Sequence, residues 1–314
     1  MKRKRYIAQT GKFKPKDCSK AKAAFGYYGA KQRISKKIIQ SLPLHNCWVE
    51  AFCGSAAITL SKPPVPIEII NDIDGQIVNF FDQLRKNPEA LYEAVSLTPY
   101  ARQEFHRARK REDDIDDLER ARRFLVESMM SVNGVLGGAQ SGFSYSQAYS
   151  RGGREARVNR WYNLPERLAT VVERLRGVRV ENRDARNLLK MFQDRPATLV
   201  YLDPPYFMSR SSGYVVDAKN EDFHLELLEI CVKSKCMILI SSYDNNLYNN
   251  TLKIEKGWDK VRIKAKTRDT TGKDYARDEI FWRNKQYMKS LKSGRVPIRL
   301  SLEEKRLKKI NPPR

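Results

Sequence analysis

The chain has 314 residues, of which 41% are hydrophobic and 10% aromatic, which is enough for a folded core and argues against a disordered chain. Its 60 Lys and Arg against 37 Asp and Glu leave a formal net charge of +23, which favours a polyanionic partner, most often nucleic acid. An anionic membrane surface and a merely solubilising surface charge are the alternatives. Five cysteines without a Cys-x-x-Cys pair predict neither a disulfide framework nor a zinc site.

The N-terminal arm, residues 1–23, is basic and has no apolar segment of the kind that secretory signals carry. No apolar stretch of the chain approaches the roughly 20 residues needed to cross a bilayer. We therefore expect a cytoplasmic protein without a membrane partner. Two basic runs are expected to add only sequence-independent attraction to phosphates, Lys2 to Arg5 in the arm and Lys305 to Lys309 in the tail.

A strand, a turn and a short helix are predicted early in the chain. The apolar run from Cys47 to Phe52 predicts a buried strand, and Gly54 and Ser55 predict a turn after it. A second buried strand, IEIINDID, ends near Asp72. A glycine turn lets a ligand approach the backbone, and an acid at the end of the next strand can accept hydrogen bonds from ribose hydroxyls. The spacing fits a nucleoside-containing cofactor, although such turns also merely connect strands and helices in many α/β proteins.

Helices dominate the next part of the chain. Apolar residues spaced at i, i+3, i+4 and i+7 predict an amphipathic helix over residues 76–86. From about 88 to 160 the alternation of strands and helices fades, so we expect an inserted subdomain. After it, an apolar helical stripe ends at Gly177, and the strand VRVEN leads to the acid Asp184.

The segment TLVYLDPPYF joins an apolar run to one acid, two prolines and a tyrosine. Residues 198–202 are typical of a buried strand, and Pro204 cannot extend a ladder because it lacks an N–H group. Ligand crevices of open α/β sheets lie at the carboxyl ends of strands, so Asp203 and Tyr206 are expected to project into one. The alternative is a strand ended by a proline turn, with Asp203 as a surface acid and Tyr206 as a packing residue.

A helix over residues 222–233 and the strand CMILISSYD continue the pattern. The helix is expected to turn Leu225, Leu228 and Cys231 inward. Strands that alternate with helices imply a largely parallel sheet.

Arginines gather between residues 151 and 186, which hold ten of them and no lysine. Arginine forks suit phosphates and guanine edges, and the aromatic residues nearby could wedge into a base stack. The arginines that we expect to contact DNA are Arg151, Arg154, Arg157 and Arg160. Three others, Arg167, Arg174 and Arg176, lie on or beside a predicted amphipathic helix and could instead form its solvated face.

Several segments resemble the motifs of one family. VEAFCGSAAITL at 49–60, NDID at 71–74 and LDPPYF at 202–207 resemble those of the Dam-like, or D12, class of adenine-specific DNA methyltransferases. FGYYGAKQR resembles the opening motif of that class, FLVESMMSVNGVLGG the segment that leads into its recognition subdomain, and RDEIFWRN its closing strand. The resemblance covers roughly residues 24–285, and the motifs stand in the Dam-like order.

Three residues depart from the pattern of the family. Ala56 stands where the cofactor loop usually has a glycine, Ala30 replaces the second glycine of the opening motif, and Tyr28 replaces its alanine. The methyl group of Ala56 is expected to narrow the approach to the cofactor, and so to affect affinity rather than identity.

The resemblance implies the α/β, Rossmann-like fold of S-adenosylmethionine-dependent methyltransferases, with a mixed, mostly parallel seven-stranded sheet and an inserted, mainly helical target-recognition subdomain. The expected parts of the chain are a basic flexible arm (1–23), a cofactor-binding part of the catalytic domain (24–87), the inserted DNA target-recognition subdomain (88–162), a catalytic part with DPPY (163–285) and a basic C-terminal tail (286–314).

The resemblance also implies S-adenosylmethionine as the methyl donor, and no metal. The residues expected to bind this cofactor are Tyr27, Lys31, Phe52, Gly54, Ser55, Asp72 and Asp184. Asp72 is expected at the ribose hydroxyls, Asp184 near the adenine of the cofactor, and Lys31 at the junction with the target base. The Asn-Gly segment adds Asn133 to the expected DNA contacts. Double-stranded DNA is the expected partner, and a companion restriction endonuclease is a candidate one.

The chemistry of an exocyclic amine gives DPPY a purpose. The residues of the expected catalytic tetrapeptide are Asp203, Pro204, Pro205 and Tyr206. Because the lone pair of adenine N6 is delocalised into the ring, the nitrogen needs acceptors for its hydrogens before it attacks a sulfonium methyl group. The Asp203 carboxylate and the Pro204 carbonyl can accept these hydrogens and stabilise the positive charge that grows on nitrogen. Tyr206 offers a face on which a flipped-out base can stack.

Alternative functions keep parts of this scheme. The same fold and cofactor could methylate cytosine N4 or an RNA base, although Asp rather than Ser at position 203 argues against cytosine. A protein-directed methyltransferase fits less well, because such relatives usually carry Asn before Pro-Pro-Tyr. A DNA-binding relative without activity is the remaining alternative, and the intact DPPY argues against it.

Overall fold

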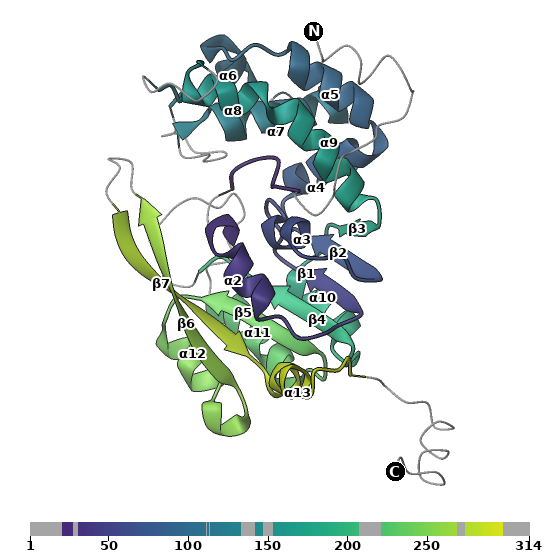
Figure 1. Cartoon of the computed structure of the whole chain (residues 1–314), viewed down its shortest axis with the longest axis vertical. Helices are drawn as coiled ribbons and strands as arrows, with labels where there is room; N and C mark the ends of the chain where they lie inside the picture. The colour runs from purple at the N-terminus through teal and green to yellow at the C-terminus, as the bar shows by residue number, and fades with distance from the viewer. Residues whose placement is uncertain are drawn as a thin grey trace.

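The computed structural model describes residues 21–27, 31–110, 112, 114–132, 142–146, 153–206, 221–268 and 274–297 (Figure 1). Its centre is a seven-stranded sheet in the order β3-β2-β1-β4-β5-β7-β6. The strands are β1 (Cys47–Glu50), β2 (Ile67–Asn71), β3 (Val178–Glu181), β4 (Thr198–Leu202), β5 (Met237–Ser242), β6 (Asp259–Arg268) and β7 (Asp274–Arg283). Neighbours among β1 to β5 pair in parallel, while β7 is antiparallel to both β5 and β6. The expected mixed, mostly parallel sheet is therefore confirmed.

Helices cover both faces of the sheet, which explains why the central strands are apolar throughout. The helices longer than one turn are α2 (Ser35–Gln40), α3 (Ala57–Ser61), α4 (Gly75–Lys86), α5 (Pro88–Leu97), α6 (Arg102–Ala108), α7 (Asp117–Met130), α8 (Ala156–Tyr162), α9 (Leu164–Leu175), α10 (Ala185–Phe192), α11 (Glu221–Lys233), α12 (Asn246–Thr251) and α13 (Lys285–Ser293). Along β4, Leu199 and Tyr201 pack with α2, α3 and α13, whereas Val200 and Leu202 pack with α10, α11 and α12. This period-2 alternation divides the core into two layers.

The region 88–162 follows α4, and its described parts are mainly helical, in α5 to α8. These helices stand together with α9 above the sheet in Figure 1. Their core is continuous with that of the sheet, because Phe80 of α4 and Phe124 of α7 stack with ring centroids 5.8 Å apart. Phe25 lies against both rings, edge to face. Phe25, the first residue of the opening motif, thus joins the helical region to the catalytic part.

The packed domain extends beyond the expected folded region at both ends. Ala21 and Ala23, assigned to the flexible arm, are buried in the core. Helix α13 occupies the first residues of the expected tail, because Asn284 caps it by accepting a hydrogen bond from Tyr287 N, and the Tyr287 side chain is fully buried. Hydrophobic contacts at both ends therefore lengthen the packed domain.

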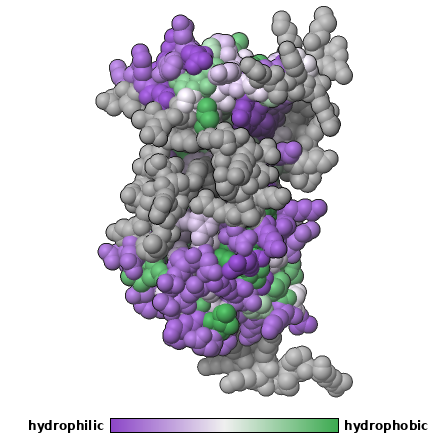
Figure 2. All heavy atoms as spheres, turned by 90° about the vertical axis from the view of Figure 1, so that its left-hand side faces the viewer, coloured by the Kyte–Doolittle hydropathy of each residue, from purple (hydrophilic) through white to green (hydrophobic). Residues whose placement is uncertain are grey.

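The burial of two helical residues differs from the sequence expectation. Leu228 and Cys231 of α11 are buried as expected, but Leu225 is 36% exposed. Arg174 does not belong to a solvated face, since it is 6% exposed and donates to both oxygens of the buried Glu68 carboxylate, at 2.5 and 2.9 Å. Arg176 is the solvated one. On the face shown in Figure 2, the described side chains of the lower half are mainly hydrophilic. None of the described helices is long and apolar enough to cross a membrane.

Candidate active site

The predicted site residues follow the carboxyl ends of parallel strands that lie side by side. Strand β1 leads into the turn Cys53–Ala56, β2 leads to Asp72, and β4 leads to Asp203. Because β1 pairs with both β2 and β4, these three groups meet at one edge of the sheet. Strand β3 adds Asp184 to the same edge. This is the edge where open α/β sheets bind ligands.

The turn after β1 depends on small residues. Gly54 has φ 47°, and a Cβ added there would lie 2.6 Å from Cδ1 of the Tyr27 ring. Glycine is required at this position both by the backbone and by the tyrosine that covers it. Ala56 also has a left-handed backbone, with φ 52°, which explains why glycine is usual there. Its methyl group is fully buried in the core beside Leu60, so it is accommodated by packing.

Asp72 is tied to the turn by its carboxylate. Its Oδ2 accepts from Gly54 N at 2.8 Å and its Oδ1 from Asp74 N at 3.0 Å, and the residue is 8% exposed. Burial raises the pKa of Asp72 to about 6, although the two backbone hydrogen bonds act in the opposite direction. A carboxylate oriented in this way keeps lone pairs for the hydroxyls of a ribose, so the residues present fit a nucleoside.

Asp184 reaches the same edge with its carboxylate already engaged. It caps α10 by accepting from Arg186 N at 2.8 Å, and the Arg186 guanidinium donates to its Oδ2 at 2.6 Å. These hydrogen bonds lower the pKa of Asp184, whose side chain is 27% exposed. Phe52 is half-buried and packs edge to face on Phe223, while Ser55 is buried.

Asp203 lies at the centre of a buried polar cluster. Lys31 Nζ is 2.9 Å from its Oδ2, and Ser241 Oγ donates to its Oδ1 at 2.6 Å. The side chains of Lys31 and Asp203 are 5% and 17% exposed. Pro204 and Pro205 are both buried. The sequence expectation that Asp203 is more than a surface acid agrees with this environment, because a pair so enclosed from water interacts strongly.

Tyr206 packs inside the same cluster. Its ring meets Tyr243 edge to face with centroids 4.2 Å apart, and Lys31 Nζ lies 4.8 Å from the ring centroid. Its hydroxyl donates a hydrogen bond to Oε2 of Glu279, a residue of β7. Burial raises the pKa of Tyr206 well above its usual value, so the tyrosine is neutral. One face of the ring is therefore occupied by the lysine in this structure.

Three residues of this neighbourhood escaped the sequence analysis. Ser241 and Glu279 stand in the quoted segments CMILISSYD and RDEIFWRN, each at the edge of an apolar run, but nothing local distinguishes them from other polar residues. Glu50, the last residue of β1, accepts from Thr59 N at 2.9 Å and from its hydroxyl. Burial raises the pKa of Glu50 to about 7. An acid inside a buried strand is the signal that could have found it.

Comparison with protein families gives a match over residues 27–267 to the D12 class N6 adenine-specific DNA methyltransferases. The chain belongs to this family. It is also 26% identical, over 210 residues, to the type II methyltransferase M1.LlaDCHI of Lactococcus lactis subsp. cremoris, a match that covers 63% of this chain and 70% of the relative. Membership makes the chain an enzyme of site-specific adenine N6 methylation of DNA, for which S-adenosylmethionine is the general methyl donor.

The arginines of this D12 methyltransferase that we expect to contact DNA differ in how exposed they are. Arg154 is exposed, with its guanidinium 4.0 Å from the centroid of the Tyr162 ring. Arg157 and Arg160 are half-buried, and Arg160 Nη2 is 3.1 Å from where a Cβ on Gly26 would stand. Burial is the largest cause of a lowered pKa at Arg160, and the charges of two neighbouring arginines add to it. Two of the predicted DNA contacts, Asn133 and Arg151, lie outside the described residues. Tyr28 and Ala30 of the opening motif also lie outside them.

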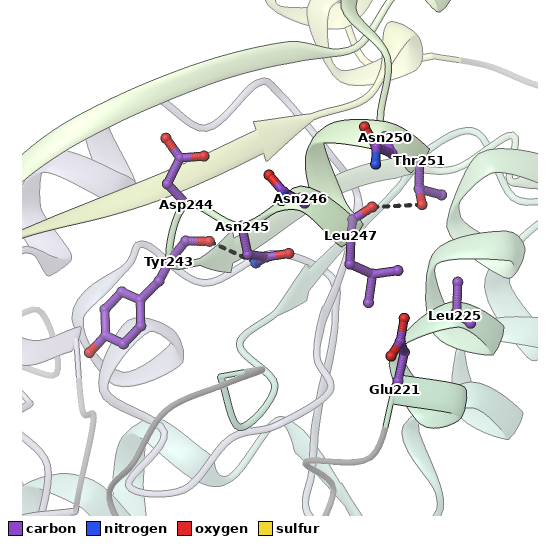
Figure 3. Close-up of a pocket in the computed structure, with 9 residues that line it drawn as sticks. All are labelled: Glu221, Leu225, Tyr243, Asp244, Asn245, Asn246, Leu247, Asn250 and Thr251. Carbon is purple, nitrogen blue, oxygen red and sulfur yellow. Dashed lines mark hydrogen bonds between the residues drawn. The ribbon is translucent and has the colours of Figure 1, made fainter.

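A hollow lies beside the Tyr206 cluster, between the end of β5, α12 and the start of α11 (Figure 3). Its lining residues are Glu221, Leu225, Tyr243, Asp244, Asn245, Asn246, Leu247, Asn250 and Thr251. Of the two carboxylates in this lining, that of Asp244 is paired with Lys260 and Arg262. Among the residues that the structure describes, no group of three or more His, Cys, Asp or Glu is arranged to hold a metal ion.

Proposed function

We propose that this methyltransferase moves the methyl group of S-adenosylmethionine to the N6 amine of an adenine extruded from double-stranded DNA, with Asp203 and the Pro204 carbonyl as the acceptors of the amine hydrogens. The observation that carries the proposal is the placement of Asp203 directly beside the turn Cys53–Ala56, since β4 and β1 are paired neighbours. The turn Cys53–Ala56 and the prolines that follow Asp203 are buried. Donor and acceptor would then be close and oriented, which accounts for much of the rate of such transfers.

The cofactor would lie against the ends of β1, β2 and β3. The residues proposed to hold it are Tyr27, Lys31, Phe52, Gly54, Ser55, Asp72 and Asp184. Once bound, S-adenosylmethionine supplies an electrophilic methyl group on a sulfonium. Asp72 would accept hydrogen bonds from the ribose hydroxyls, in an orientation fixed by Gly54 N and Asp74 N. Asp184 can serve the adenine of the cofactor only with the oxygen lone pairs that Arg186 leaves.

The amine would donate one hydrogen bond to Asp203 and one to the Pro204 carbonyl. These hydrogen bonds localise the nitrogen lone pair, and the carboxylate stabilises the positive charge that develops on nitrogen. After transfer the methylated amine is strongly acidic, so its proton leaves without a strong base. Tyr206 would form one wall of the base pocket, together with Tyr243 that packs on it.

DNA would be held by the second half of the inserted region, which includes α8. The residues proposed to contact it are Asn133, Arg151, Arg154, Arg157 and Arg160. Support comes from Arg154, exposed beside the Tyr162 ring, and from the chain's charge of +23. A restriction endonuclease that cuts the same site is a candidate companion, and the cytoplasm, where the DNA is, is the expected compartment.

The decisive experiment incubates the protein with S-adenosylmethionine and plasmid DNA that lacks adenine methylation, and then identifies the modified nucleosides by mass spectrometry. We expect N6-methyladenine. N4-methylcytosine in its place would favour the cytosine alternative, and methylation of RNA but not of DNA would reject the substrate. If calorimetry detects cofactor binding while no modified nucleoside forms on any substrate, the protein is a DNA-binding relative without activity.

A further inference from the structure

Two carboxylates share one ammonium group at the catalytic edge. Lys31 Nζ lies 2.9 Å from Asp203 Oδ2 and 3.9 Å from Glu279 Oε2, and the Glu279 side chain is 11% exposed. Glu279 comes from β7, the antiparallel strand. Since Ile280 pairs with Ser242 at the end of β5, Glu279 stands one step beyond that end, at the same edge as Asp203.

The ion pair with Lys31 conflicts with the proposed use of Asp203. Both carboxylate oxygens of Asp203 have donors, Ser241 on Oδ1 and Lys31 on Oδ2. An adenine amine that donates to Oδ2 would lie against the ammonium of Lys31. As methyl transfer proceeds, positive charge would grow on a nitrogen beside a full positive charge, and like charges at such separations repel strongly in a water-poor site. A productive complex therefore needs another place for the ammonium.

We propose that Glu279 is this place: when the target adenine enters, Lys31 transfers its ion pair from Asp203 to Glu279 and frees Oδ2 for the amine. This inference rests on the proposed function of Asp203. The displacement is short, because the present 3.9 Å needs to shrink only to the roughly 2.8 Å of a charge-assisted hydrogen bond. Glu279 is a positioning residue, and it acts on the reaction through Lys31.

Contacts with Tyr206 and with β6 hold Glu279 in position to receive the lysine. The hydroxyl of Tyr206 donates to its Oε2, and the backbone around it pairs with β6, where Ile263 is its partner. A carboxylate offers about four lone-pair sites, and Lys31 Nζ already lies within ion-pair distance of Oε2. The same hydrogen bond links the position of Glu279 to the ring of Tyr206, which forms a wall of the proposed base pocket.

The test is a double-mutant cycle of Glu279→Gln and Lys31→Met. Glutamine retains an oxygen that accepts from Tyr206 but loses the charge that attracts Lys31. We expect Glu279→Gln to slow methylation of plasmid DNA, at saturating DNA and cofactor, by about tenfold or more. In the Lys31→Met background the same substitution should cause no further loss, because no ammonium is left to relocate.

The control is Asp278→Asn, a neighbouring carboxylate on β7 that pairs with Arg262 at 3.2 Å. This variant should methylate within about twofold of the wild type. The inference is overturned if Glu279→Gln is as active as the wild type, or if it lowers the rate by the same factor with and without Lys31, which would make it a structural support of Tyr206. Its failure is distinct from that of the proposed methyl transfer to adenine, which fails if the wild type forms no N6-methyladenine.

Discussion

Substitution of Asp203 by asparagine removes one charge from the catalytic edge and keeps the shape of the side chain. The amide oxygen can still accept from Ser241, which now donates to Oδ1 at 2.6 Å. The amide nitrogen would then face Lys31 Nζ, 2.9 Å from the present Oδ2, so that a donor replaces an acceptor. We expect methyl transfer to be lost while the fold and the cofactor pocket remain.

The size of the effect follows from the charge that Asp203 would stabilise. Two unit charges 4 Å apart interact by about 4 kcal/mol at an effective dielectric constant of 20, and a half-developed charge on nitrogen by about half of that. Removal of one preorganised hydrogen-bonding group at a developing charge costs about 3 to 4 kcal/mol in other enzymes. A loss of about 2 to 4 kcal/mol corresponds to a fall in rate of roughly 30-fold to 10³-fold.

The assay measures N6-methyladenine by mass spectrometry over time, beside calorimetric binding of S-adenosylmethionine to the same preparation. Asp203→Ala should lose activity to a similar extent and keep its cofactor affinity. Asp278→Asn, which changes an acid at the edge of the hairpin, serves as the control. If Asp203→Asn retained a tenth or more of the wild-type rate with normal cofactor binding, the carboxylate would not have the role that we assign to it.

Three further outcomes are expected. Gly54→Ala should weaken cofactor binding about tenfold by calorimetry and lower the melting temperature, since its Cβ would lie 2.6 Å from the Tyr27 ring at φ 47°; an unchanged affinity would contradict this. The pKa of Asp72 is about 6, so the carboxylate takes up a proton as pH falls through that value, and cofactor affinity should fall with it; Asp72→Asn should remove this pH dependence, and a flat wild-type profile would refute it. Arg174→Met removes two hydrogen bonds to the Glu68 carboxylate but leaves Lys62 as its cationic partner, so it should lower the free energy of unfolding by about 1.5 to 3 kcal/mol in urea titrations; an unchanged free energy would mean that the pair does not support the fold.

The elements that sequence predicted best are those whose signal is local. The strand at 198–202 is apolar at every position and is followed by Pro204, so both its existence and its end could be read from neighbouring residues. The helix predicted at 76–86 begins one residue earlier, because the Asp74 carboxylate caps it by accepting from Gln76 N. The order of the motifs predicted the methyltransferase fold, and the seven-stranded sheet confirms it.

The rest depends on contacts between distant parts of the chain. Glu279 lies at the catalytic edge only because β7 runs antiparallel to β5, and no periodicity in the sequence specifies that direction. Arg174 follows the polar pattern of an exposed helical residue, yet α9 places it over the equally buried Glu68, 106 positions away. Such pairings are invisible until the elements are packed, since each residue alone looks like a solvated charge.

The continuous core between α4 and the inserted helices limits how the enzyme could be re-engineered. Phe80 and Phe124 stack across the boundary at which a designer would cut the gene to exchange one recognition region for another. A chimaera joined at residue 88 would set a foreign α7 against the native α4, so that Phe25 would keep its contact with Phe80 but lose the one with Phe124. Transplants of DNA specificity between members of this class should therefore carry α4 and the opening segment along with the helices that follow them.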